Sequence, residues 1–214
     1  MQAVIERPNR KSNQLIHMYS GVRGGMMMEP LQFISGAGIL DRHLVVFRDP
    51  ENQFYHGKIS PEMNNIDANI QWQRESVAEK AHITELYCAG TSLGAYAALL
   101  FGHYLEADAV HAFGPITKID MSWWARQDMK ISIPRPPVPR HHLNLATLLA
   151  NWNGKTQFHI YYSAGNEFDA EEAGRMSECP NVHLHPIPGT NHNIFACDEG
   201  KALLPSIFPP PTRP

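Results

Sequence analysis

Short apolar runs alternate with helical segments along most of this chain. The predicted strands span residues 15–20, 44–47, 83–89, 107–113, 156–163 and 182–186. The predicted helices span residues 61–80, 93–105, 170–176 and 194–204. Strands that are separated by helices pair in parallel, because a crossover helix returns the chain to the same end of the sheet. The alternation therefore predicts an α/β fold with a mainly parallel sheet flanked by helices.

Two internal segments do not follow this alternation. Residues 30–40 fit a short helix or a strand, because Gly36 and Gly38 interrupt both periodicities. Residues 114–153 lack regular periodicity and contain a run of closely spaced prolines. We expect one domain over residues 1–214, in which 114–153 form a lid-like insertion over the C-terminal edge of the sheet. Residues 205–214 form a proline-rich tail.

The composition excludes several classes of partner. The formal net charge of −3 provides no basic excess of the kind that nucleic acid binding requires. The chain has no apolar run near 18 residues, and residues 1–13 lack the apolar core of a secretory signal, so we expect no membrane association and a cytoplasmic location. The 3 cysteines are an odd number without C-x-x-C spacing, which favours free thiols in a reducing compartment.

A candidate nucleophile lies between the strand 83–89 and the helix 93–105. Residues 90–94 read Gly-Thr-Ser-Leu-Gly, which fits the pattern G-x-S-x-G in the strand–turn–helix setting that this pattern requires. A serine at such a tight turn is held in a strained backbone conformation, so the residues two positions away must lack bulk. Gly90 and Gly94 meet this requirement. The sequence therefore predicts Ser92 as a nucleophile.

A serine hydroxyl needs a base near neutral pKa, and histidine is the natural choice. The chain order nucleophile, acid, histidine leaves His183, His185 and His192 as candidates. His183 and His185 alternate within a predicted strand, whereas His192 lies in a loop before the last helix, where its side chain can reach the serine. We therefore predict His192 as the base. His141 and His142 could bind a metal ion, but their spacing supplies no third ligand.

The acid that orients the histidine is less closely defined. The loop after the strand 156–163 holds both Glu167 and Asp169. We prefer Asp169 because it comes just before the predicted helix 170–176, although an N-cap role for Asp169 is the competing interpretation. Asp120 is a third candidate.

Acyl transfer at Ser92 also needs donors for the oxyanion and a pocket for the acyl group. One donor is expected to be the backbone N–H of Leu93, and the second that of Gly21 or Val22, which follow the strand 15–20. Trp123 and Trp124 are expected to line an apolar acyl pocket, or equally to anchor the insertion in the core.

The chain resembles the α/β-hydrolase superfamily through residues 90–94, 166–169 and 189–193, and the similarity in order and spacing extends over about residues 15–205. Residues 47–50, 53–57 and 112–115 look like those of a small, poorly characterised bacterial branch. One departure concerns the oxyanion loop, where residues 19–25 replace the His-Gly-Gly-Gly of common esterases. The resemblance implies hydrolysis of an ester, or less often of a thioester or amide, through an acyl-enzyme.

Together these features predict a serine hydrolase that acts on a small-molecule acyl ester without a metal or organic cofactor. The alternatives are an acyltransferase, a thioesterase or a peptidase with the same triad, and a binding protein that keeps this fold without turnover.

Overall fold

A computed structural model describes residues 2–120 and 138–211 of the chain. The strands are β1 (Val4–Arg7), β2 (Gln14–Tyr19), β3 (His43–Phe47), β4 (Glu85–Thr91), β5 (Ala109–Phe113), β6 (Gln157–Ser163) and β7 (Val182–Ile187). The α-helices are α1 (Pro30–Gly36), α2 (Ile66–Ala78), α3 (Leu93–Tyr104), α5 (Leu145–Leu149), α6 (Glu167–Gly174) and α7 (Asp198–Leu203). Short 3-10 helices are η1 (Val22–Gly24), η2 (Arg140–His142), η3 (Ile194–Ala196) and η4 (Leu204–Ser206).

The strands form one seven-stranded sheet in the order β1-β3-β2-β4-β5-β6-β7. All neighbouring pairs are parallel except β1 and β3, which are antiparallel. The predicted α/β fold with a mainly parallel sheet is therefore confirmed. The carboxyl ends of β2 to β7 meet at one edge of the sheet, where α/β proteins place their functional loops.

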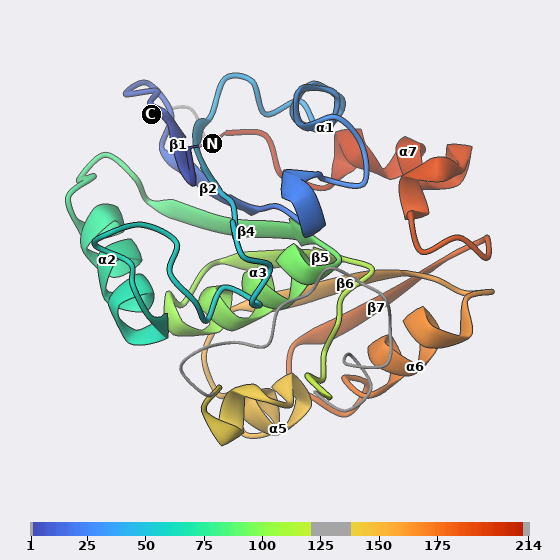
Figure 1. Ribbon diagram of the computed structural model, residues 1–214. Coiled ribbons are helices and arrows are strands. Elements are labelled where there is room, and N and C mark those ends of the chain that lie inside the picture. The colour runs from blue at the N-terminus through green and yellow to red at the C-terminus, as the bar shows by residue number, and fades with distance from the viewer. Residues whose placement is uncertain (1, 121–137, 212–214) are drawn as a thin grey trace.

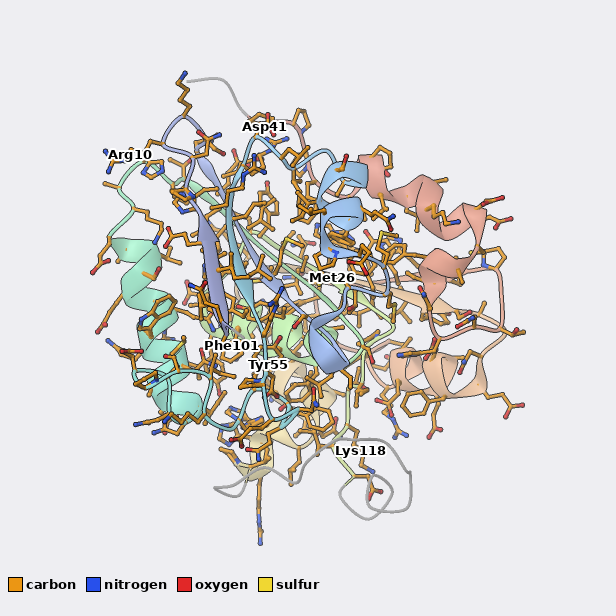
Figure 2. All side chains as sticks on the ribbon, turned by 45° about the horizontal axis from the view of Figure 1, so that its top comes forward. Arg10, Met26, Asp41, Tyr55, Phe101 and Lys118 are labelled. Atoms are coloured by element: carbon orange, nitrogen blue, oxygen red, sulfur yellow. The ribbon has the colours of Figure 1, made fainter. Side chains whose placement is uncertain are left out.

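Helices cover both faces of the sheet, with α1 and α7 on one face and α2, α3, α5 and α6 on the other (Figure 1). Side chains fill the layer on each side (Figure 2). Because side chains alternate along a strand, neighbouring residues of β2 contribute to different layers. Leu15 and Tyr19 belong to the α3 layer, and Ile16 and Met18 to the α1 layer.

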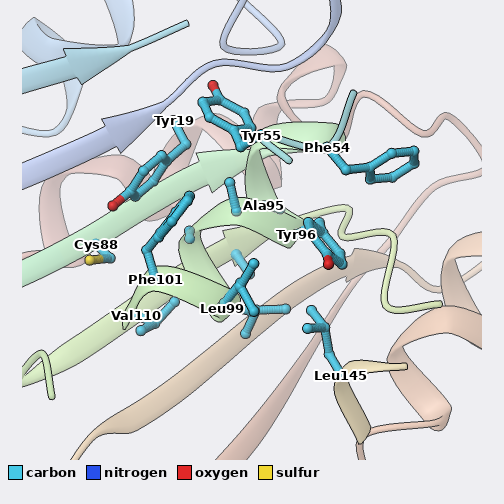
Figure 3. Packing of buried hydrophobic residues seen from close by; sticks show 14 of the residues in the cluster. Tyr19, Phe54, Tyr55, Cys88, Ala95, Tyr96, Leu99, Phe101, Val110 and Leu145 are labelled. Atoms are coloured by element: carbon cyan, nitrogen blue, oxygen red, sulfur yellow. The ribbon is translucent and has the colours of Figure 1, made fainter. Parts of the chain in front are cut away.

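Helix α3 is the centre of the larger layer. Every residue from Leu93 to Gly102 is buried. The ring of Phe101 stacks on Tyr19 at a centroid distance of 5.3 Å, and Tyr55 meets both rings edge to face (Figure 3). Gly102 lets the helix approach the sheet closely, since a Cβ there would lie 2.2 Å from Cγ2 of Val110.

The structure corrects several predicted boundaries. The helix predicted over 61–80 begins at Ile66, because the Asn65 side chain accepts the N–H of Ala68 and caps it. Residues 30–40, left open between helix and strand, contain helix α1 with Pro30 at its first turn. The helix predicted over 194–204 is divided into η3 and α7, with Cys197 extended between them.

Strand β1 was not predicted at all. It has 4 residues, is partly exposed, and pairs at the edge of the sheet through Val4 opposite Phe47. The proline-rich tail contributes to the core, since Phe208 is buried against the rings of Tyr87 and His111. None of the helices within 2–120 and 138–211 is long and apolar enough to cross a bilayer.

Several histidines are packed inside this fold in the neutral form. Burial lowers the pKa of His17, His56 and His111 to about 3. Burial also lowers the pKa of His142 and His159 to about 4, helped by neighbouring histidines. Protonation of these rings is therefore disfavoured in the folded state and unhindered in the unfolded chain.

Substitution at Gly102 tests the packing of α3 on β5. Gly102→Ala should destabilise the protein by about 1–3 kcal/mol, because the added methyl group overlaps the stiff Val110 side chain. The matched control is Gly174→Ala in α6, where a Cβ meets nothing within 4 Å. This control should raise stability by about 0.5–1 kcal/mol by removing a helical glycine. Urea unfolding of both variants measures the difference, and equal effects would contradict the packing described.

The neutral buried histidines predict a pH dependence of stability. Because their folded pKa lies below the ordinary value of 6.5, the unfolded chain binds more protons once the pH falls below about 6.5. Stability should therefore be complete above that pH and decrease toward about pH 4, by up to about 1.4 kcal/mol per pH unit for each fully buried ring. Asp49 is one group that acts in the opposite direction. Because burial raises its pKa, its protonation favours the folded state as the pH falls. Urea unfolding between pH 7 and about pH 4 measures this stability. A free energy of unfolding that stays constant or increases as the pH falls would contradict the prediction.

Candidate active site

Ser92 lies at a tight turn between β4, which ends at Thr91, and α3, which begins at Leu93. Its backbone has φ 53° and ψ −119°, a conformation that residues with a side chain rarely adopt. The N–H of Ser92 donates to the carbonyl oxygen of Phe113 at 2.8 Å, which ties the turn to the end of β5. The strained serine predicted from the sequence is present at this turn.

The two glycines that flank the serine are required by close backbone contacts. A Cβ at Gly90 would lie 2.1 Å from the carbonyl oxygen of Gly94. A Cβ at Gly94 would lie 2.1 Å from the carbonyl oxygen of Tyr19, on the neighbouring strand β2. Neither backbone oxygen can move without disrupting its own element. Both positions therefore exclude any larger residue, as the turn pattern predicts.

His192 lies in the loop between β7 and η3, and its ring reaches both Ser92 and Asp169. The distance from Nε2 of His192 to Oγ of Ser92 is 3.0 Å. The distance from Nδ1 of His192 to Oδ1 of Asp169 is 2.6 Å. With Nδ1–H donating to the carboxylate, Nε2 is left as the acceptor for the serine hydroxyl. The structure brings together the three residues selected from the sequence.

Asp169 is fully buried and lies in the first turn of α6, not just before the helix as predicted. The N-cap of α6 is Asn166, whose side chain accepts the N–H of Asp169 at 3.2 Å. Because the helix begins at Glu167, two positions before Asp169, the two acids point in different directions: Glu167 is exposed and Asp169 faces inward. Asp120, the third candidate, is exposed.

The backbone N–H groups predicted as oxyanion donors lie at the beginnings of two helices. Leu93 is the first residue of α3 and Val22 the first residue of η1, and N–H groups at such positions have no partner within their own helix. Gly21 lies close to the nucleophile, since a Cβ there would be 2.9 Å from the carbonyl oxygen of Thr91. Its own N–H, however, donates to the carbonyl oxygen of Gly25 at 2.8 Å. Of the two predicted second donors, Val22 is the one that this loop leaves available.

A buried tyrosine that the sequence reasoning did not select holds this loop. The hydroxyl of Tyr55 lies 2.9 Å from the carbonyl oxygen of Ser20 and 3.0 Å from that of Phe47. The only available signal was its place in the segment 53–57, which the resemblance had singled out without assigning a role.

A hydrogen bond joins the loop that holds His192 to the segment after η1. The Asn193 side-chain amide donates to the carbonyl oxygen of Met27 at 2.7 Å, and Met27 itself has φ 58°. Gly114, with φ 54°, lies beneath both loops: a Cβ there would lie 2.9 Å from the terminal methyl of Met27 and 3.2 Å from Cε1 of His192. Gly114 and Asn193 lie in the segments 112–115 and 189–193 that carry the resemblance, but the sequence assigned neither a role, because their roles depend on contacts between distant loops.

The predicted insertion is described only at its two ends. Glu172 is buried and accepts the N–H of Lys118 and the hydroxyl of Thr117, which fixes the chain after β5 onto α6. Lys118 pairs with Asn144 in an isolated antiparallel bridge. Trp123 and Trp124 lie outside the described residues, so their predicted place in an acyl pocket stays a prediction.

Of the two histidines considered for metal binding, His142 has its Nε2 in contact with a tyrosine hydroxyl. His142 is buried, and its Nε2 lies 2.8 Å from the hydroxyl of Tyr104. Within the described part of the chain, no group of three or more histidine, cysteine or acidic side chains has the arrangement of a metal site.

No family model matches the sequence, and no curated protein matches it by sequence comparison. Solved structures do match. A capsule O-acetyltransferase of Neisseria meningitidis serogroup A, solved in complex with CoA, is 13% identical with a TM-score of 0.68, over 95% of this chain and 90% of that one. Est1E from Butyrivibrio proteoclasticus is 15% identical with a TM-score of 0.62, over 94% and 88% of the two chains.

An α/β-hydrolase enzyme from the metagenome of Lake Arreo, Spain, is 14% identical with a TM-score of 0.58, over 94% of this chain and 75% of that one. The structural neighbours thus include esterases and an acetyltransferase. At these identities the likeness concerns the fold alone. The chain has the α/β-hydrolase fold, as the resemblance implied.

Substitution at Gly114 tests whether this glycine positions His192. Gly114→Ala should slow the labelling of Ser92 by a fluorophosphonate roughly 10- to 100-fold, because the methyl group displaces the imidazole that activates the serine. Gly38→Ala is the control, since Gly38 also has positive φ, 65°, but a Cβ there meets nothing within 4 Å. Both variants bear the backbone strain, of about 1–2 kcal/mol, and only Gly114→Ala should lose reactivity. Equal labelling rates for the two variants would show that Gly114 does not position the ring.

Proposed function

We propose that this protein is a serine hydrolase that cleaves carboxylic esters through an acyl-enzyme intermediate. In this proposal Ser92 is the nucleophile, His192 the base and Asp169 the acid that orients the histidine. The observation that carries it is the continuous chain of contacts at 3.0 Å and 2.6 Å that joins the serine hydroxyl, the imidazole and a buried carboxylate. A strained serine at the start of a helix adds support, because such strain is retained at functional sites.

The reaction begins when Oγ of Ser92 attacks the ester carbonyl carbon while its proton passes to Nε2 of His192. The carbonyl oxygen becomes an oxyanion, and in this proposal the N–H groups of Leu93 and Val22 donate to it. The C–O bond to the alcohol then breaks, and His192 returns the proton to the departing oxygen. Water repeats the sequence on the acyl-enzyme, which releases the carboxylic acid and restores Ser92.

Asp169 contributes through the histidine and does not touch the substrate. Its carboxylate, fully removed from solvent, accepts Nδ1–H and so holds the ring with Nε2 toward the serine. A buried negative charge beside the ring also stabilises the imidazolium that forms when the serine loses its proton. None of these steps requires a metal ion or an organic cofactor.

The same triad could pass the acyl group to an acceptor other than water. Acyltransferases, thioesterases and peptidases share the first half of the reaction and differ in the acceptor or the leaving group. These alternatives, and a binding protein without turnover, are separated by the choice of substrate.

The test of function uses chromogenic acyl esters of graded chain length, a peptide panel and acyl thioesters, each with and without an added alcohol. We expect hydrolysis of the esters by the wild-type protein, labelling by a fluorophosphonate probe, and loss of both in Ser92→Ala. Preferential transfer to the alcohol would make the protein an acyltransferase. If the wild-type protein shows no turnover and no labelling, the catalytic proposal is wrong and a binding protein is favoured.

The identity of the acid is tested by a pair of isosteric variants. Asp169→Asn removes the charge while keeping the shape, and should lower kcat and kcat/KM together by a factor on the order of 10⁴. Glu167→Gln makes the same change two positions away on an exposed side chain and should retain near wild-type kcat. Steady-state kinetics on one chromogenic ester measures both. The reverse result would assign the role to Glu167, against the buried contact of Asp169.

A further inference from the structure

Arg48, the residue directly after β3, has a partly buried side chain without a partner. Its Nε is shielded from solvent and has no hydrogen-bond partner. The residue forms no salt bridge within the described ranges 2–120 and 138–211. The terminal nitrogens of the guanidinium are not shielded in this way, so its charge is available to an anionic ligand.

Nε of Arg42 and of Arg175 is also buried without a hydrogen bond, but both of these arginines form ion pairs with carboxylates. Arg42 lies 3.1 Å from the carboxylate of Asp41 and donates to the side-chain oxygen of Gln14 at 2.6 Å. Arg175 forms ion pairs with glutamates of its own helix. Arg48 therefore differs from the arginines that this fold uses for structure.

Arg48 lines a pocket of about 290 Å³, which we call the Arg48 pocket. The pocket is lined by Gln2, Ala3, Gly24, Arg48, Asp49, Pro50 and Asn52. Its one carboxylate, that of Asp49, is already used by its own loop. The carboxylate accepts backbone N–H groups from Glu51, Gln53 and Tyr55. The guanidinium is thus the one charged side chain among these lining residues that has no hydrogen bond or ion pair to a described residue.

The Arg48 pocket adjoins the proposed oxyanion hole. A Cβ at Gly24 would lie 3.5 Å from Cδ and Nε of Arg48, so the guanidinium stem packs directly against η1. The same short helix begins with Val22, the proposed second donor. Strand β3 is separated from β4 by β2 alone, and two strand spacings amount to about 10 Å.

We propose that the Arg48 pocket binds a carboxylate group of the substrate, about 10 Å from the scissile carbonyl. The proposal rests on the proposed ester hydrolysis and names its substrate class: esters with an anionic end. A carboxylate matches the guanidinium in geometry and in single charge. The small volume and the aliphatic surfaces of Ala3 and Pro50 fit a short carbon chain that carries this group.

The arrangement of charges around the nucleophile supports this orientation. Asp169 follows β6, two strands from β4 on the side away from β3. An anionic substrate end at Arg48 therefore lies far from the buried negative charge of the triad. The opposite orientation would bring the substrate anion toward Asp169, whereas the carboxylate that lines the Arg48 pocket, Asp49, is already stabilised by three backbone N–H groups.

The kinetic test compares substrates that differ only in a terminal carboxylate. On the acyl side, nitrophenyl half-esters of glutarate, adipate and suberate are set against nitrophenyl esters of fatty acids of equal carbon number. On the alcohol side, butyrate esters of ω-hydroxy acids are set against butyrate esters of the corresponding alkanols. We expect one side and one chain length to be preferred, which identifies the part of the substrate that carries the anion.

Arg48→Met keeps the aliphatic stem against Gly24 and removes the charge. It should raise KM for the preferred anionic ester roughly 10- to 100-fold while leaving the neutral esters unchanged. Arg48→Lys should retain part of the preference. The control is Arg10→Met, which removes the same charge from an exposed turn; Arg10 lies far from Tyr55 and hence from the loop after Arg48 (Figure 2). This control should affect neither class of ester.

A binding measurement separates this proposal from the proposed function. Calorimetry should show that Ser92→Ala binds at least one of monomethyl glutarate, monomethyl adipate, monomethyl suberate and the butyrate esters of the ω-hydroxy acids, and that Ser92→Ala with Arg48→Met binds none of them. This result supports the carboxylate site even if no ester is hydrolysed. Absence of binding to Ser92→Ala, equal losses on anionic and neutral esters, or a lowered melting temperature of Arg48→Met would overturn the proposal and make Arg48 a structural residue.

Discussion

The contact between α3 and β2 at Gly94 is the constraint on which the candidate site depends. Because Gly94 has no side chain, the first turn of α3 lies directly on the carbonyl oxygen of Tyr19. The chain must then leave β4 and enter α3 within one residue, which places Ser92 at φ 53°. The same approach brings the loop after β2, with Val22, beside the serine. The absence of a side chain at Gly94 thus permits both the turn that holds Ser92, the proposed nucleophile, and the approach of the loop that holds Val22, the proposed second oxyanion donor.

Such a turn is stable only if the surrounding structure compensates the strain. Backbone conformations of this kind cost about 1–3 kcal/mol each, and both Ser92 and Met27 adopt positive φ near the site. Ser92 is held through its N–H by Phe113, and Met27 through its carbonyl oxygen by Asn193. Helix α3 beneath the turn, buried from Leu93 to Gly102, supplies the rigid base that these hydrogen bonds require.

Secondary-structure elements and site residues could be predicted from the sequence where they depend on neighbouring residues, and not where they depend on contacts between distant segments. The elements around Ser92 were predictable because their residues are buried on both faces and read as continuous apolar runs, and His192 because its loop has only one suitable residue. Strand β1 was not predictable, since 4 half-exposed residues carry no periodicity. The choice between Glu167 and Asp169 was only weakly supported, because it depends on where the Asn166 cap starts α6. The requirement for glycine at position 114 was not predictable, because it comes from contacts with Met27 and His192, which are distant in the sequence.

The order of the strands divides the edge of the sheet into two halves with different chemistry. In the proposed reaction, the loops after β6 and β7, on one side of β4, supply the carboxylate and the imidazole, so proton transfer occurs in that half. The loops after β2 and β3, on the other side, would supply a backbone donor and the cation of Arg48, which favour negative charge on the substrate there. A substrate bound across the strand ends would then place its oxyanion and a remote carboxylate in one half, and the imidazolium would form in the other beside Asp169, where attraction to its carboxylate is strongest.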